Sequence, residues 1–149
     1  MISIIIPAHN EKDSLGGLLT RLEGLNSQKP IEVIVALSCE TNDGSEDIIS
    51  SGKVQLLRCR GNGRAAQMNA AVQKSRGEIL VFLHADVIPP NSFFQDICYT
   101  LDSIYDAGFF SYKFDKESFF LKINAKFSKK DGIFTGGGIN VSLSKEKLF

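Results

Sequence analysis

His84 and Asp86 lie two residues apart, directly after the apolar run from Ile79 to Leu83 and just before two prolines. If the extended backbone of that run continues, both side chains point to the same side and can face one ligand. Magnesium and manganese ions take one or two carboxylates from a protein and bind substrate phosphates as well. The pair therefore predicts a metal-assisted phosphate site. The alternative is that Asp86 only begins a turn and His84 packs at the strand end.

The segment 58–64, RCRGNGR, places three arginines around two glycines at the predicted start of a helix. Free backbone amides and guanidinium groups together favour phosphate, so we expect a local anion site here; a solvated basic turn is the alternative. Gly61, Gly63 and Ala66 also match the G-x-G-x-x-A pattern of dinucleotide-dependent oxidoreductases. That pattern normally occupies the first turn between a strand and a helix, whereas here it follows the third predicted strand.

The charges of the chain balance, with 17 basic and 17 acidic residues among 149. No global field of either sign is therefore available to recruit nucleic acid or an anionic membrane. We expect no nucleic-acid partner, and any anion site must be local.

The cysteines and the first apolar run indicate a cytoplasmic protein. Cys39, Cys59 and Cys98 are an odd number without C-x-x-C spacing, which favours core thiols in a reducing compartment over disulfides or a zinc site. The N-terminal run is only a few residues long and has no basic leader, so it predicts neither a signal peptide nor a membrane span. Peripheral attachment to the inner face of the membrane is the alternative location.

Short runs rich in isoleucine and valine alternate with segments of helical period, which is typical of α/β units around a mostly parallel sheet. Four runs predict buried strands: Ile2 to Ile6, Glu32 to Leu37, Val54 to Leu57 and Ile79 to Leu83. Their continuous apolar character fits strands that are covered on both faces. Segments 108–115 and 136–144 alternate as strands do. We treat residues 1–149 as one domain.

Helices are expected between these runs. The first has leucines at the i, i+3, i+4, i+7 spacing of one buried stripe and is expected to be capped by Asp13 or Ser14. The third is expected to close with Gly77 just past its end. Another amphipathic helix should begin after the prolines. The phenylalanines of 109–127 favour core packing over a platform for an acceptor.

Taken in order, four segments resemble family 2 glycosyltransferases of the GT-A fold: ISIIIPAHNE, EVIVALSCETNDGS, RGNGRAAQMNAAVQKSRGEILVFLHAD and TGGGINVSLSKEKLF. The likeness is strongest from Arg60 to Asp86, where GRAAQMN and FLHAD are similar to a bacterial subgroup. It implies a Rossmann-like, three-layer α/β domain with a mostly parallel central sheet. Family members usually run well past the position of Phe149, so we expect the C-terminal part of the usual domain to be missing.

The resemblance implies a nucleotide-diphosphate-sugar donor lying across the strand ends. Pro7, Ala8 and Glu11 look like nucleoside contacts because PAHNE matches the first-strand loop of the family. Ser38 stands where the family has an aspartate that binds the base. Arg64 matches a basic position near the base and the phosphates.

The HAD segment stands where the family has its D-x-D motif, so His84, Ala85 and Asp86 look like donor contacts. Asp86 looks like the residue that joins a divalent cation, manganese or magnesium, to the diphosphate. His84 takes the place of the first acidic residue, as in the subgroup. Such a cation would neutralise charge on the departing nucleoside diphosphate.

The resemblance implies transfer of a sugar, with inversion, to an acceptor that the sequence does not identify: a glycan, a lipid or a small molecule. An inverting transfer needs a base near the acceptor hydroxyl. The spacing singles out neither Asp115 nor Asp131, so the base is expected beyond this chain. Two alternatives stay open: a catalytically impaired binding or assembly module of the same fold, which could pair as a homo-oligomer, and a dinucleotide-dependent oxidoreductase.

Overall fold

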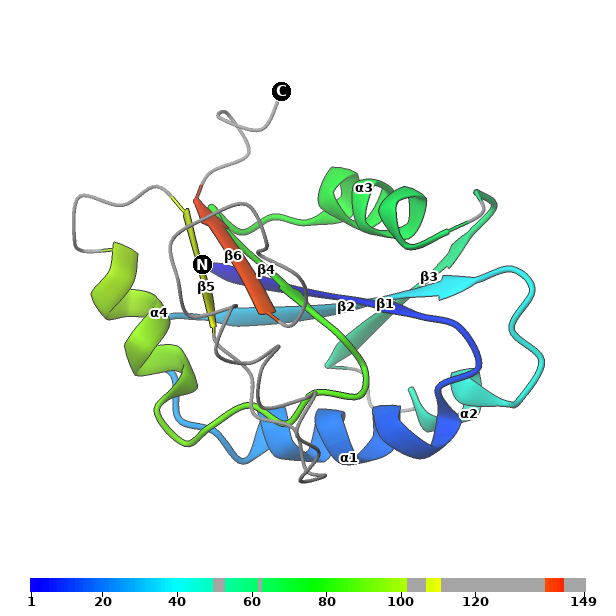
Figure 1. Cartoon of the computed structure of the whole chain (residues 1–149), viewed down its shortest axis with the longest axis horizontal. Coiled ribbons are helices and arrows are strands. Elements are labelled where there is room, and N and C mark those ends of the chain that lie inside the picture. The colour runs from blue at the N-terminus through cyan, green and yellow to red at the C-terminus, as the bar shows by residue number, and fades with distance from the viewer. Residues whose placement is uncertain (50–52, 62, 102–106, 111–138, 144–149) are drawn as a thin grey trace, which may run out of the picture.

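The computed structural model of the chain describes residues 1–49, 53–61, 63–101, 107–110 and 139–143. These residues form a six-stranded sheet in the order β3-β2-β1-β4-β6-β5, with helices on both faces (Figure 1). The strands are β1 Ile2–Ala8, β2 Ile31–Ser38, β3 Val54–Cys59, β4 Ile79–Leu83, β5 Ala107–Phe110 and β6 Ile139–Leu143. The helices are α1 Lys12–Glu23, α2 Ser45–Ile48, α3 Arg64–Lys74 and α4 Phe93–Leu101.

Four neighbouring strands, β3, β2, β1 and β4, run parallel, which confirms the predicted α/β class and the position of all four early strands. Every residue of β1 is buried, since this strand lies between β2 and β4 and is covered on both faces. The late alternating segment forms β6, which pairs antiparallel with β4 and with β5. The sheet is therefore mixed, with its antiparallel strands at one edge.

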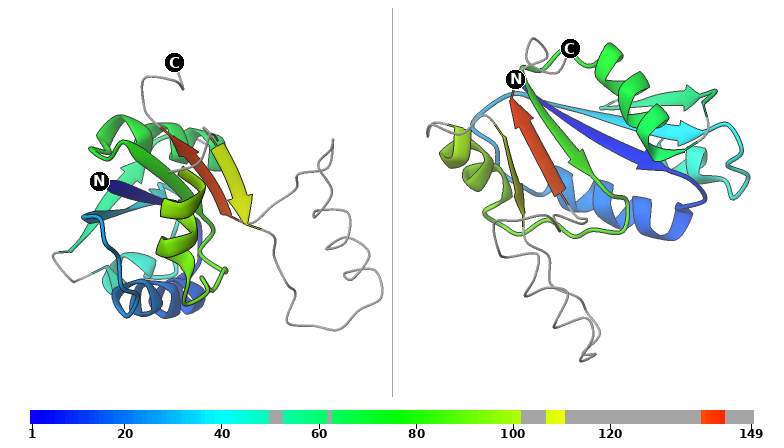
Figure 2. Two further views of the ribbon diagram at one scale, coloured as in Figure 1. Left: turned by 90° about the vertical axis from the view of Figure 1, so that its left-hand side faces the viewer. Right: turned by 45° about the horizontal axis from the view of Figure 1, so that its top comes forward.

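Two hydrophobic cores flank the sheet. On one face, the predicted leucine stripe of α1 and the phenylalanines of α4 pack with Ile4 and Ile6 of β1. On the other face, Ala71 and Val72 of α3 pack with Ile5, as the alternation of side chains along a strand requires. Figures 1 and 2 show α1 and α3 on opposite sides of the sheet. Helices α1 and α3 cover opposite faces because the chain moves across the sheet in one direction from β1 to β3 and in the other direction from β3 to β4.

The predicted helix ends are wrong in detail. Helix α1 begins at Lys12 with Glu11 in the N-cap position and no side-chain cap, so Asp13 and Ser14 lie inside its first turn. The Ser14 hydroxyl instead donates to the Glu11 carboxylate at 3.4 Å. Helix α3 ends at Lys74 with Ser75 as its C-cap residue, so the helix closes before Gly77.

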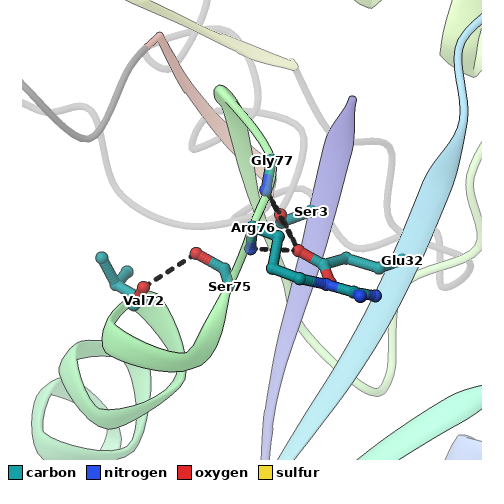
Figure 3. Close-up of polar contacts among 6 residues, drawn as sticks. All are labelled: Ser3, Glu32, Val72, Ser75, Arg76 and Gly77. Atoms are coloured by element: carbon teal, nitrogen blue, oxygen red, sulfur yellow. Dashed lines mark hydrogen bonds and ion pairs between the residues drawn. The ribbon is translucent and has the colours of Figure 1, made fainter.

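Gly77 is required by a close approach of two backbones. A Cβ atom at this position would lie 2.4 Å from Ser3 Oγ and 2.8 Å from both Met1 O and Ser3 N. Its backbone N–H donates to Ser3 Oγ at 2.8 Å and to Glu32 Oε1 at 3.1 Å (Figure 3). These contacts join β1, β2 and the loop before β4 at the amino-terminal end of the parallel strands.

The C-terminal third is described only in part. The Phe110 ring of β5 lies 5.4 Å from the Phe93 ring of α4, centroid to centroid, which supports the core interpretation for this one phenylalanine. Residues 111–127 of the phenylalanine-rich stretch, which include Asp115, lie outside the described residues, and so does Asp131. Ile104, which the sequence pattern assigns to the helix after the prolines, also lies outside them. Within the described ranges, no helix is both long enough and apolar enough to cross a membrane.

Candidate functional site

Polar side chains gather where the parallel strands end at their carboxyl edge, the edge at which open α/β sheets bind ligands. A cavity of about 350 Å³ lies at the ends of β1 and β2 beside the first turns of α3. Five predicted donor contacts line it: Pro7, Ala8, Glu11, Ser38 and Arg64. Four residues outside the predicted donor contacts complete the lining: His9, Glu40, Gly63 and Gln67.

The loop after β1 is tied to the loop after β2. Asn10 adopts a left-handed conformation with φ 54°, and its side-chain oxygen accepts a hydrogen bond from the Asn42 backbone N–H at 3.0 Å. The Asp43 carboxylate accepts from the Lys12 backbone N–H at 2.9 Å and from Ser45. These bonds hold the two loops together. The loop after β1 places Glu11 in the lining of the cavity.

Ser38 is the last residue of β2, and its hydroxyl is held by the turn that follows. Its Oγ accepts a hydrogen bond from the Glu40 backbone N–H at 3.3 Å, and its carbonyl accepts from the Thr41 N–H at 3.1 Å. Cys39 is exposed because the chain leaves the sheet here, so the prediction of a core thiol is wrong for Cys39, although Cys59 is buried.

Arg64 begins α3, and its side chain is exposed at the cavity. Gly63 precedes it with φ 93°, a conformation that residues with a Cβ atom rarely adopt. The predicted cluster of three arginines does not form as one site, because Arg58 is paired with Glu46 of α2 and lies away from the cavity lining. Arg64 is therefore the arginine that can meet an anionic ligand in the cavity.

The HAD segment follows β4 at the same edge of the sheet. The Val87 backbone N–H donates to the His84 carbonyl at 3.2 Å, so Asp86 sits in a turn, as the simpler interpretation expected. The Asp86 side chain is exposed, whereas Ala85 is buried in the core below. The structure thus presents Asp86 to solvent at the strand end, and it places Ala85 among core side chains rather than in the cavity lining.

The charged groups at this edge of the sheet affect the pKa of the His84 imidazole. Burial lowers the pKa of the His84 imidazole below its usual range, and the positive charge of Arg64 lowers it further. The carboxylates of Asp86 and Glu11 oppose the shift only in part. Glu11, Arg64 and Asp86, which come from three separate segments of the sequence, therefore all act on one imidazole.

The family model "Glycosyl transferase family 2" matches residues 3–143. This chain belongs to that family. A curated relative, the undecaprenyl-phosphate 4-deoxy-4-formamido-L-arabinose transferase of Pseudomonas fluorescens, is 30% identical over 100 residues, which are 60% of this chain and 28% of the relative. The chain thus spans less than a third of the length of that relative.

Two solved structures share the fold of this family 2 chain. The mannosyltransferase PcManGT from Pyrobaculum calidifontis, in complex with GDP-Man and Mn²⁺, aligns with a TM-score of 0.72 and 20% identity over 99% of this chain and 45% of its own. Glucosyl-3-phosphoglycerate synthase from Mycobacterium tuberculosis, in complex with Mn²⁺, UDP and phosphoglyceric acid, aligns with a TM-score of 0.56 and 23% identity over 68% of this chain and 38% of its own. The likeness confirms the predicted GT-A fold.

Gln67 is the buried residue among the four cavity residues of this family 2 chain that lie outside the predicted donor contacts. Its side chain is only 4% exposed, and its amide nitrogen donates to the carbonyl oxygens of Ala8 at 2.7 Å and Ala36 at 2.8 Å. One signal was available in the sequence. Gln67 lies four residues before the buried Ala71, so the helical period places a polar side chain on the core-facing stripe of α3.

No group of three or more His, Cys, Asp or Glu side chains in the described part of the chain is arranged to hold a metal ion by itself. A magnesium or manganese ion bound together with phosphate needs fewer protein ligands, often one or two carboxylates. The exposed Asp86 carboxylate at the end of β4 meets that requirement. The residues present therefore fit a cation that arrives with a phosphorylated ligand.

Proposed function

We propose that this chain binds a nucleoside-diphosphate sugar and a divalent cation, and that it is the donor-binding part of a glycosyltransferase. The observation that carries the proposal is the convergence of Glu11, Ser38 and Arg64 on one cavity, with Asp86 at the neighbouring strand end. The family membership supports the same reading. So do the names of the two solved structures, which include GDP-Man, UDP and Mn²⁺.

Charge orients the donor in this proposal. Arg64 and the free amides of the first turn of α3 attract the diphosphate, as the N-terminus of a helix does for anions. Asp86 holds Mn²⁺ or Mg²⁺ against the same diphosphate. The nucleoside then extends toward Pro7, Ala8 and Ser38, at the ends of β1 and β2.

The reaction we propose is an inverting transfer. An acceptor hydroxyl oxygen attacks the anomeric carbon of the sugar, the bond from that carbon to the diphosphate oxygen breaks, and a base takes the hydroxyl proton. Asp86 is the residue that would hold a divalent cation, which would supply positive charge to the diphosphate. Arg64 adds a second positive charge on the same side. The acceptor is a glycan, a lipid or a small molecule.

A thermal-shift measurement tests the binding proposal. We expect UDP or GDP, added with Mn²⁺, to raise the melting temperature of the purified chain. A nucleotide at about 100 times its dissociation constant stabilises a protein by about 2.7 kcal/mol. Absence of any shift with UDP, GDP and their sugars, with or without Mn²⁺, would overturn the proposal.

A matched pair of variants on α3 tests the role of Arg64. Arg64→Ala removes the cation at the cavity, and we expect the nucleotide-induced shift to become much smaller. Lys74→Ala removes an exposed cation at the far end of the same helix, and we expect the wild-type shift. Equal shifts in both variants would contradict the assignment of Arg64 to the diphosphate.

A further inference from the structure

The orientation of the Gln67 side-chain amide is determined by the chemistry of its partners. Both partners, the carbonyl oxygens of Ala8 and Ala36, are acceptors only, so the NH₂ group must face them. Each of its two hydrogens is then used. The other amide atom, Oε1, is left as an acceptor, and no residue in the described ranges donates a hydrogen bond to it.

The two bonds link α3 to the ends of two neighbouring parallel strands. Ala8 is the last residue of β1, and Ala36 of β2 is the register partner of Pro7. Gln67 supplies N–H groups from α3 to the ends of β1 and β2 at this level. The side chain therefore sets how the two strand ends lie relative to α3, and it does so beneath residues that line the cavity.

The sheet order indicates which part of a donor meets Gln67. Asp86 follows β4, on one side of β1, whereas Gln67 bonds to β1 and β2 on the other side. If the diphosphate lies by Arg64 and Asp86, the nucleoside extends over the ends of β1 and β2. The base end of the cavity is then lined by three residues that carry acceptor oxygens: Ser38, Glu40 and Gln67.

We infer that Gln67 is a specificity residue, whose Oε1 accepts a hydrogen bond from a ring N–H of the nucleobase while its NH₂ group holds the ends of β1 and β2. Uracil and guanine carry such a ring N–H next to a carbonyl, whereas cytosine and adenine present a bare ring nitrogen there. An acceptor that faces a lone pair cannot form this hydrogen bond, which disfavours the wrong base. This inference rests on the proposed function and adds the base class that the site selects.

The test compares four nucleotides on the whole chain by calorimetry with Mn²⁺ present. We expect UDP or GDP, whichever binds more tightly, to bind at least about tenfold more tightly than CDP and ADP, as one well-placed hydrogen bond allows. In Gln67→Met, a variant of similar length without an acceptor, we expect this preference to fall to near unity. The affinity for inorganic pyrophosphate should stay at the wild-type value.

A matched control and a second measurement keep the outcomes distinct. Gln73→Met changes an exposed glutamine on the same helix and should keep the base preference. If Gln67→Met weakens all four nucleotides and pyrophosphate equally, Gln67 is structural only and the inference is overturned. If the variant does not fold, methylation of the ring nitrogen decides: N3-methyl-UDP or N1-methyl-GDP must bind the wild-type chain at least about tenfold more weakly than the parent nucleotide, and equal binding overturns the inference. If the wild-type chain binds no nucleoside diphosphate at all, the proposed function fails as well.

Discussion

The Glu32 carboxylate of β2 accepts a hydrogen bond from the backbone N–H of Gly77, 45 residues further along the chain, at 3.1 Å (Figure 3). The same carboxylate accepts hydrogen bonds from Ser3 and from Arg76, whose guanidinium nitrogen lies 3.1 Å away. Glu32 is only 8% exposed, so a charged group is held near the core by its partners. The cluster fastens the end of the sheet opposite the cavity.

Stability should fall in acid because of Glu32. Burial raises the pKa of this carboxyl, but the hydrogen bonds from Ser3, Arg76 and Gly77 outweigh burial and lower the pKa below the ordinary 4.5. The unfolded chain therefore binds a proton more readily. The stabilisation is fully present above pH 4.5 and is lost as the pH falls through the pKa of the folded state. We measure the free energy of unfolding in urea at a series of pH values. It should depend less steeply on pH in Glu32→Gln than in the wild type, whereas Glu23→Gln, which changes an exposed residue, should match the wild type.

Two glycine substitutions should change stability in opposite directions. Gly77→Ala places a Cβ atom against Ser3 and against the Met1 carbonyl, which is backbone and cannot move aside, so we expect a loss of about 1–3 kcal/mol in the free energy of unfolding. Gly17→Ala meets nothing within 4 Å on the exposed face of α1 and should add about 0.5–1 kcal/mol. Equal effects in urea unfolding would contradict the steric account of Gly77.

Asp86→Asn should remove the metal-dependent part of nucleotide binding. The substitution keeps the size of the side chain but takes away the charge that a divalent cation requires. We expect Mn²⁺ to tighten the binding of UDP or GDP to the wild-type chain by at least about tenfold more than to the variant, measured by calorimetry with and without MnCl₂. Asp13→Asn changes an exposed carboxylate in the first turn of α1 and should keep the full effect of Mn²⁺.

Alkylation of Cys39 should report occupancy of the cavity. Cys39 is exposed between Ser38 and Glu40, which both line the cavity. Cys59 should react slowly, since it is 4% exposed and burial, aided by the neighbouring Cys39, raises the pKa of its thiol. Mass spectrometry after timed exposure to iodoacetamide should show Cys39 modified before Cys59, and bound nucleotide should slow the reaction of Cys39. Modification of Cys39 at the same rate with and without nucleotide would contradict the placement of the ligand.

Local patterns in the sequence were enough to predict the α/β class, the four parallel strands and the buried stripe of α1. Runs of isoleucine and valine and the spacing of leucines express the period and the buried face of one element, which depend only on nearby residues. The expectation that polar residues meet at the carboxyl edge needed no knowledge of the strand order, because parallel strands place their carboxyl ends at one edge. This expectation singles out Asp86 and the arginine-rich turn before α3, whereas Glu11 and Ser38 follow from the resemblance to the family.

Only the tertiary structure decided which of the residues singled out from the sequence are already engaged in contacts within the protein. Arg58 pairs with Glu46, Ala85 faces the core, and Gly77 is needed for the approach of Ser3. The sequence alone determined that Gln67 is a polar residue on a core-facing stripe. Its meeting with Ala8 and Ala36, 59 and 31 residues away, depends on the order of the strands and on the face that α3 covers. Such contacts follow from the packing of whole elements against each other, and no pattern within one segment encodes that packing.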